Sequence, residues 1–327
     1  MARFRIKGGN SIKGIFKPRG NKNAVLPMLA ASLLTDKPII LNNIPLIDDV
    51  KVMLELLETL GVKVDLDGHT VKLDASNIRI TDLDEALCSR VRTSILLAGP
   101  LSARHGSATI FPPGGDVIGK RRLDTHFHGL SSLGVEININ TSYQFKASGL
   151  KGCDIILDEA SVTATENILM AAVLAEGDTT IYNAACEPHV QDLALLLNTM
   201  GATITGIGTN RLSVSGVKDL HGADYNVQPD YIEIGSFIAA AVATGGELEI
   251  PGITNSLALQ VMERTYSRLG IRWSIKDDNL FLPRQSYRSI ESDVGTPTLK
   301  IEDGIWPAFP SDLMSVSIVL ATQTKGT

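Results

Sequence analysis

Apolar and polar positions form a pattern along this chain that recurs about every 70 residues. A helix-like segment ends in Leu-Gly or Met-Gly, and a strand with alternating apolar and polar residues follows it, as in Val62–Asp67. The junctions are Gly61, Gly134, Gly201 and Gly270. Glycine directly after a helix often takes the left-handed conformation that ends the helix. The spacing therefore predicts a fold built from copies of one unit.

A second element alternates with these junctions. It is a helix-like segment rich in Ala, Ser, Leu and Ile that is apolar on nearly every side, at residues 23–34, 93–103, 166–175, 233–244 and 312–322. Helices of this kind are expected to be buried. A short strand follows each of the first four, as at residues 179–182 and 247–250. Each repeat is thus predicted to contain two helices and several strands.

The repeats predict a mixed α/β (α+β) fold with two domains. Three repeats would form a first domain at residues 22–228, and residues 1–21 with 229–327 would form a second. The fifth apolar helix ends at about residue 322, where its strand should begin. We interpret the second domain as incomplete and the chain as shortened; the alternative is a natural short form that closes differently.

Composition narrows the class of protein. The chain has 327 residues, 44% of them hydrophobic, with a net charge of −6 and a pI of about 5.6, which argues against a nucleic-acid-binding protein. Cys88, Cys153 and Cys186 are scattered without metal-ligand spacing. No apolar run reaches the roughly 18 residues of a membrane helix, and the N-terminus lacks the apolar core of a signal peptide. We expect a cytoplasmic protein.

The most informative segment is the loop at residues 112–122. It contains three glycines and ends in three consecutive cations, Lys120–Arg122, with Asp116 among them. Backbone N–H groups and guanidinium groups bind phosphate or carboxylate oxygens, so the loop predicts an anion site in which Asp116 moves a proton or orients a group. The loop also matches the start of a nucleotide-binding P-loop, but Arg121 occupies the position of the Ser or Thr that would hold Mg²⁺.

Four segments together resemble the enolpyruvyl transferase family. They are Gly20–Pro27, the loop from Pro113 to His126, Ser161–Thr165, and Ala308–Asp312, in the family's order along the whole chain. The resemblance implies a two-domain inside-out αβ barrel of about 70-residue βαβαββ repeats, with the last repeats truncated and the active site between the domains.

The resemblance also implies the reaction. The enolpyruvyl group of phosphoenolpyruvate would be transferred to the 3′-hydroxyl of UDP-N-acetylglucosamine with release of phosphate, the first committed step of peptidoglycan synthesis for the cell wall. It implies these two small-molecule substrates as partners, no cofactor and no metal, and we expect a monomer without nucleic-acid or membrane partners. Two alternatives remain: 5-enolpyruvylshikimate-3-phosphate synthase, whose Lys-Ser pair would replace Lys22-Asn23, and a non-catalytic nucleotide-sugar-binding paralogue or inactive fragment.

Site residues follow from matching positions. The resemblance implies Lys22, Asp116 and Asp312 as catalytic residues and Lys22, Asn23 and Arg121 as ligands of phosphoenolpyruvate. For the nucleotide sugar it implies Arg92, Arg121, Arg122, Leu123, Asp124, Thr125, Glu159, Ala160, Ser161, Val162 and Asp312. Asp312 would be the base for the sugar hydroxyl, and it is also a candidate N-cap of the helix that follows.

Several positions depart from the family pattern. Asp116 occupies the position of the usual catalytic cysteine, the expected acid, so the epoxide antibiotic fosfomycin, which alkylates that cysteine, should not inactivate this protein. Arg122 replaces a common proline, Thr163 a common glycine and Tyr231 a common arginine. The pair His126 and His128 would lie on different sides of a helix, which argues against a metal site.

Overall fold

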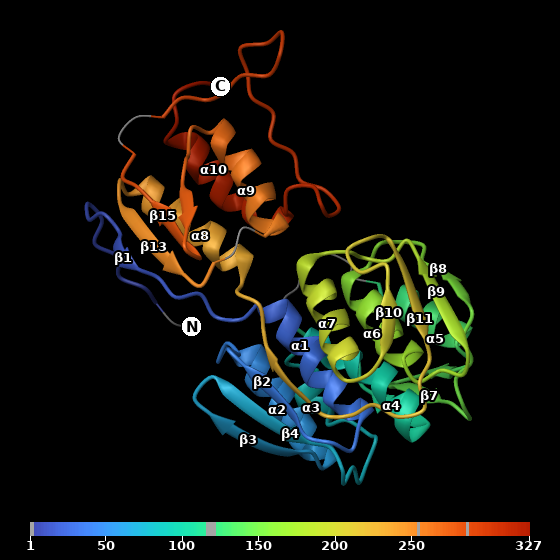
Figure 1. Ribbon diagram of the computed structural model, residues 1–327. Coiled ribbons are helices and arrows are strands. Elements are labelled where there is room, and N and C mark those ends of the chain that lie inside the picture. The colour runs from blue at the N-terminus through green and yellow to red at the C-terminus, as the bar shows by residue number, and fades with distance from the viewer. Residues whose placement is uncertain (1–2, 116–121, 254–255, 286–287) are drawn as a thin grey trace. The chain divides into compact units, whose positions relative to one another are not determined.

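The protein divides into two compact units in a computed structural model that describes residues 3–115, 122–253, 256–285 and 288–327 (Figure 1). The larger unit comprises Gly20–Gln228, and the smaller comprises Met1–Arg19 with Pro229–Thr327. The fold mixes helices and small sheets in both units. No described helix is both long and apolar enough to span a membrane.

The described part of the larger unit forms three repeats. Each repeat has its own sheet and the element order strand–helix–hairpin. The first contains β2 (Ile39–Asn42), α2 (Asp48–Leu60), β3 (Lys63–Asp67) and β4 (Thr70–Asp74), with β12 (Ala223–Asn226) added at its edge. The second contains β5 (Ser107–Ile110), α5 (Asp124–Ser132), β6 (Glu136–Ile139) and β7 (Tyr143–Lys146). The third contains β8 (Asp154–Ile156), β9 (Asp178–Tyr182), α7 (Pro188–Thr199), β10 (Thr203–Thr205) and β11 (Arg211–Ser215).

Strand pairing repeats along with the element order. The hairpins are antiparallel, whereas β12 pairs with β2 in parallel, with Ala223 opposite Ile39. In the same way β8 pairs with β9 in parallel, with Asp154 opposite Thr180. This arrangement excludes a P-loop fold, because β5, the strand before the glycine-rich loop, lies in an antiparallel sheet with β7 and β6 rather than in a parallel sheet.

The predicted helix-ending glycines are confirmed. Gly61, Gly134, Gly201 and Gly270 follow α2, α5, α7 and α9 (Leu257–Arg268) with φ of 103°, 99°, 101° and 76°. All four helices hold the same place in the repeat, between a strand and a hairpin. The repeat in the sequence is therefore a repeat of backbone conformation.

Three apolar helices form the core of the larger unit, α1 (Lys22–Ala31), α4 (Ala98–His105) and α6 (Val162–Ala172). Every residue from Ala24 to Ala31 and from Ala164 to Ala172 is buried, as predicted. Figure 1 shows α1 and α6 with the sheets on the outside of this unit. Short elements complete it: η1 (Ser32–Leu34), α3 (Glu85–Cys88) and η2 (Arg92–Leu97).

The prediction of one continuous helix at residues 93–103 was wrong. The segment consists of the 3₁₀ helix η2 followed by α4. Pro100 offers a reason, because it has no N–H to donate to the carbonyl of Leu96 and its ring would clash with that carbonyl in an α-helix.

The smaller unit contains the same order once more. β13 (Glu247–Pro251), α9, β14 (Ser274–Lys276) and β15 (Asn279–Leu282) form a sheet in which β1 (Lys13–Ile15) pairs with β13 in parallel. The apolar helices are α8 (Tyr231–Ala243) and α10 (Met314–Thr322), the latter preceded by η3 (Ser311–Leu313). α10 packs against α8, but Ile318 and Val319 are 62% and 52% exposed, so α10 lacks the all-round burial that its composition predicted.

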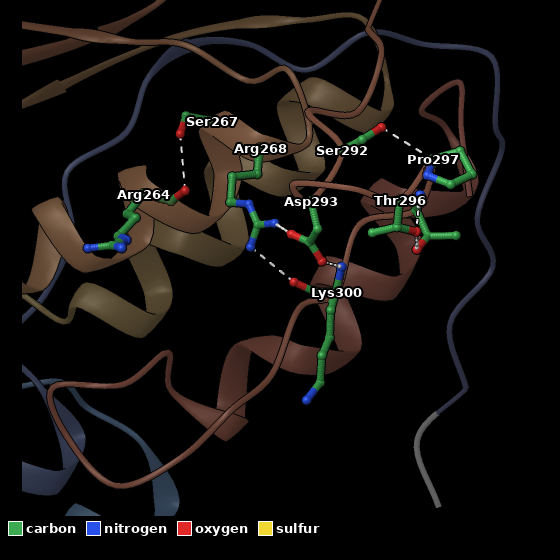
Figure 2. A network of polar contacts seen from close by, with 9 residues as sticks. Arg264, Ser267, Arg268, Ser292, Asp293, Thr296, Pro297 and Lys300 are labelled. Carbon is green, nitrogen blue, oxygen red and sulfur yellow. Dashed lines mark hydrogen bonds and ion pairs between the residues drawn. The ribbon is translucent and has the colours of Figure 1, made fainter.

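A polar network holds the loop after β15 against α9 (Figure 2). Arg268 at the end of α9 pairs with Asp293, and its Nη1 donates to the carbonyl of Lys300 over 3.0 Å. The N–H of Lys300 donates to Asp293 Oδ2 over 2.9 Å. One arginine thus closes the loop between residues 293 and 300.

Replacing a helix-ending glycine should destabilise the larger unit. In Gly61→Ala, the added Cβ would lie 2.7 Å from the carbonyl oxygen of Asn77 at a φ of 103°. We expect the free energy of unfolding to fall by about 1–3 kcal/mol, from left-handed strain and the clash together. Gly68→Ala is the control, since Gly68 also has a positive φ of 54° but no atom within 4 Å of its Cβ position. The measurement is urea denaturation followed by circular dichroism. If both variants lose the same unfolding free energy, the clash with Asn77 does not contribute to the effect.

Candidate active site

The start of α1 presents Lys22 and Asn23. Asn21 caps the helix, since its side-chain oxygen accepts the backbone N–H of Asn23 at 2.8 Å and of Ala24 at 3.1 Å. The backbone N–H of Asn23 is therefore engaged with the cap. Lys22 Nζ lies 2.7 Å from Asp49 Oδ2 in the first turn of α2, so a carboxylate contacts this cation.

Arg92 is the first residue of η2, and the glycine-rich loop begins beside it. A Cβ on Gly114 would lie 1.7 Å from the carbonyl oxygen of Ser89, and a Cβ on Gly115 would lie 3.2 Å from the N of Arg92. Only glycine allows the loop to approach this closely. Asp116 and Arg121 themselves lie outside the described residues.

The start of α5 is connected to the segment before α6 by charged groups. Arg122 Nε lies 2.8 Å from Asp124 Oδ2, and Arg122 Nη2 lies 3.3 Å from Asp158 Oδ2. The carbonyl of Arg122 accepts Arg92 Nη2 at 3.4 Å. Arg122, Leu123 and Asp124 therefore lie next to Arg92, and the Arg122 guanidinium is paired with two carboxylates.

Thr125 adds a buried contact to the same segment. Its hydroxyl lies 2.8 Å from Asp158 Oδ1 and 3.3 Å from Glu159 Oε1, although the side chain is only 1% exposed. The Thr125 hydrogen bond is the main reason that the pKa of Asp158 is lowered, and Arg122 lowers it further. Asp158 is thus an ionised anchor between α5 and the residues before α6.

Residues 159–162 form a tight turn into α6. The N–H of Ser161 donates to the carbonyl of Glu159 over 2.8 Å, and the carbonyl of Ser161 accepts the Thr165 N–H at 2.9 Å. Glu159 and Ala160 belong to this turn, and Val162 is the first residue of α6. The predicted nucleotide-sugar residues 159–162 are thus held at a helix N-terminus, which favours bound anions.

A buried polar cluster lies behind these segments. His126 Nε2 lies 3.0 Å from Thr163 Oγ1, and His126 Nδ1 lies 3.1 Å from Asn167 Nδ2. Burial, with a smaller contribution from Arg92, lowers the pKa of His126 to about 3. His126 is buried and His128 is exposed, so the prediction that they do not share a face is confirmed. The described residues contain no group of three side chains suited to a metal ion.

Asp312 lies in the smaller unit, within η3. No side chain caps η3 or α10 by a hydrogen bond, so the interpretation of Asp312 as an N-cap was wrong. Its carboxylate is exposed. The proposed role of Asp312 as a base stays a prediction.

The structure thus brings Arg92, residues 122–125 and residues 159–162 together in the larger unit and places Lys22 and Asn23 at the start of α1, which packs against η2 and α6. Asp158 and Asn167 were not predicted as site residues from the sequence. A signal existed for Asn167, because a polar residue in a helix that is otherwise apolar requires buried hydrogen-bond partners.

Comparison with known proteins supports the resemblance. Residues 6–327 match the family described as EPSP synthase (3-phosphoshikimate 1-carboxyvinyltransferase). The chain is 48% identical over 328 residues to a UDP-N-acetylglucosamine 1-carboxyvinyltransferase of Borreliella burgdorferi and 47% identical to that of Treponema denticola, covering all of this chain and 77% of each relative.

Solved structures share the fold. The enolpyruvyl transferase NikO from Streptomyces tendae matches with a TM-score of 0.83 at 22% identity, covering 97% of this chain and 74% of NikO. An EPSP synthase from Acinetobacter baumannii matches with a TM-score of 0.69 at 18% identity, covering 88% of this chain and 67% of that protein.

The cap at Asn21 should be measurable through stability. Asn21→Ala removes the acceptor for two backbone N–H groups, and we expect the free energy of unfolding of the larger unit to fall by about 1 kcal/mol. Asn21→Asp keeps an acceptor and adds a negative charge at the helix N-terminus, so it should retain the stability. Urea denaturation at pH 7 compares the two variants, and an alanine variant as stable as the aspartate variant would contradict the capping role.

Proposed function

The chain belongs to the EPSP synthase family of enolpyruvyl transferases, and from this premise we propose that it transfers the enolpyruvyl group of phosphoenolpyruvate to the 3′-hydroxyl of UDP-N-acetylglucosamine. Phosphate is released. The protein is a transferase by its family, and the proposed place of the reaction is the cytoplasm, at the entry to peptidoglycan synthesis. The proposed active form is a monomer.

The observation that carries the choice of substrate is the 48% identity to a relative named for the nucleotide sugar, over the full length of this chain. The rival within the family acts on a shikimate phosphate, and the likeness to its solved structure at 18% identity supports only the fold. Lys22-Asn23 also differs from the Lys-Ser pair expected of that rival.

Binding of phosphoenolpyruvate requires cations, because the substrate carries a phosphate and a carboxylate. Lys22 and Arg121 are the proposed cations and Asn23 the proposed polar ligand. The ion pair between Lys22 and Asp49 supports this role for Lys22, because the carboxylate keeps the ammonium group at the start of α1 when no substrate is bound. A bound phosphate would then compete with Asp49 for the same cation.

The nucleotide sugar is proposed to bind along three segments of the larger unit. They are Arg92, residues 121–125 and residues 159–162, with Asp312 as a further ligand. Backbone groups of the turn at residues 159–162 and the start of α5 are suited to polar contacts with a ligand. Because Asp124 and Asp158 engage the Arg122 side chain, we assign to Arg122 mainly a backbone role.

The chemistry requires one proton donor and one acceptor. As O3′ forms a bond to C2 of phosphoenolpyruvate, Asp312 is proposed to take the hydroxyl proton and Asp116 to give a proton to C3. Loss of a proton from C3 and cleavage of the bond between C2 and the phosphate oxygen then release phosphate and restore the double bond between C2 and C3. Asp116 must be protonated in the complex, where the cations of the loop favour the ionised carboxylate and bound phosphate favours the protonated form.

Phosphate release tests the proposal directly. We expect this chain to release phosphate from phosphoenolpyruvate with UDP-N-acetylglucosamine and not with shikimate 3-phosphate. Lys22→Gln should lower kcat/KM at least 100-fold, or about 2.7 kcal/mol, because a neutral amide cannot offset the phosphate charge. A matched control is Lys51→Gln, which removes an exposed lysine of α2 that pairs only weakly with Asp48, at 4.0 Å.

The outcomes separate the alternatives. Release with shikimate 3-phosphate alone would overturn the proposed substrate. No release with either acceptor, together with calorimetric binding of UDP-N-acetylglucosamine, would favour a non-catalytic nucleotide-sugar-binding protein.

Fosfomycin provides an independent prediction. A carboxylate is a much weaker nucleophile toward an epoxide than a thiolate is, so we expect the native protein to keep its full activity and its unmodified mass in the presence of the drug. Asp116→Cys should gain one drug adduct in intact-mass spectrometry. Asp312→Cys is the control for general thiol reactivity; an adduct on Asp116 in the native protein would contradict the prediction.

A further inference from the structure

His126 holds together the segments that carry the proposed nucleotide-sugar ligands, yet it is only 1% exposed. It lies in the first turn of α5, directly after Asp124 and Thr125. Its partner Thr163 directly follows the turn at residues 159–162, and its partner Asn167 is one helical turn further along α6. The imidazole therefore connects two of the three proposed ligand segments.

Asn167 connects the third segment. Its Nδ2 donates to the carbonyl of Ile95 in η2 over 2.9 Å, and its Oδ1 accepts the N–H of Gly99 at 2.7 Å. Arg92 begins η2, so this buried amide ties the Arg92 segment to α6. A Cβ on Gly99 would lie only 2.5 Å from Asn167 Oδ1, which shows how closely the two helices approach.

These contacts determine where the imidazole proton lies. Ile95 offers a carbonyl and Gly99 offers an N–H, so the orientation of the Asn167 amide is fixed from both sides. The Asn167 amide nitrogen can only donate, and His126 Nδ1 must accept. The proton is then on Nε2, which donates to Thr163 Oγ1. A charged imidazolium would place two donors against each other at Asn167.

We propose that His126 is a positioning residue for the nucleotide-sugar site, acting through Thr163 and Asn167 to set the relative orientation of the η2, α5 and α6 segments. The proposal rests on the proposed function. His126 is not a catalytic residue here, because both of its ring nitrogens are occupied by protein groups and its ring is buried. Small displacements of substrate-binding groups can cost large factors in affinity and rate.

Binding of UDP-N-acetylglucosamine by titration calorimetry tests the proposal, and steady-state kinetics adds the KM for phosphoenolpyruvate as a second readout. In His126→Ala we expect Kd for the nucleotide sugar to rise about 10- to 100-fold, while KM for phosphoenolpyruvate changes less than threefold. Thr163→Val, which keeps the shape but removes the acceptor, should raise Kd about 5- to 10-fold. Thr163→Ser keeps the hydroxyl and should restore affinity to within twofold of the native protein.

His189→Ala is the matched control for loss of a buried imidazole. His189 is 7% exposed and lies in α7, away from the three segments in sequence. We expect this variant to lose stability but to keep its Kd. If His126→Ala binds within twofold of the native protein, or if His189→Ala weakens binding equally, the proposal is overturned. Should His126→Ala fail to fold, the two Thr163 variants decide the question.

The proton position gives a test that does not depend on the proposed function. In ¹⁵N-histidine NMR spectra, His126 should show a protonated Nε2, an unprotonated Nδ1 and no titration between pH 5 and pH 8. A titration midpoint near 6.5, or a protonated Nδ1, would overturn the hydrogen-bond arrangement on which the proposal depends. Absence of any nucleotide-sugar binding by the native protein would instead contradict the proposed function.

Discussion

The buried helix of each repeat is apolar on nearly every side, so its ends are the parts that can reach water. The first backbone N–H groups of a helix have no partner within the helix and need caps or ligands. Lys22, Arg92 and Val162 each begin such a buried element in the larger unit, and Asp312 lies just before α10, the corresponding helix of the smaller unit. These four residues therefore share one position in the repeat, whereas the proposed ligands at residues 122–125 lie at the start of α5. Because the sides of these helices are buried, the N–H groups at their N-termini are the groups that can contact a ligand.

Much of the fold could be predicted because it depends on local patterns. A glycine with positive φ and a helix made of small apolar residues leave clear signals, and both recur in each unit. Two features could not be read in this way. The 3₁₀ turn before Pro100 depends on how a proline interrupts the winding, and the exposure of Ile318 and Val319 depends on which elements cover α10.

The local segments of the candidate site could be predicted from the sequence, but the contacts between residues that are distant in sequence could not. The segments at residues 122–125 and 159–162 followed from the resemblance, and their mutual contact through Thr125 and Asp158 appears only in three dimensions. Asn167 and His126 are 41 residues apart, and no periodicity pairs them. The ligand and catalytic roles of all the site residues stay predictions. Asp116 and Arg121 lie outside the described residues, and Asp312 belongs to the smaller unit.

The close approach of Gly99 to Asn167 has a consequence for how this protein can evolve. Asn167 fills the space that any side chain at position 99 would need, and Gly99 supplies the N–H that Asn167 requires. A Cβ at position 99 would also lie 2.3 Å from the backbone carbonyl oxygen of Asn167, so no side-chain change at position 167 can make room for it. Position 99 is therefore expected to stay glycine whatever residue occupies position 167, and a change at position 167 must still satisfy the N–H of Gly99.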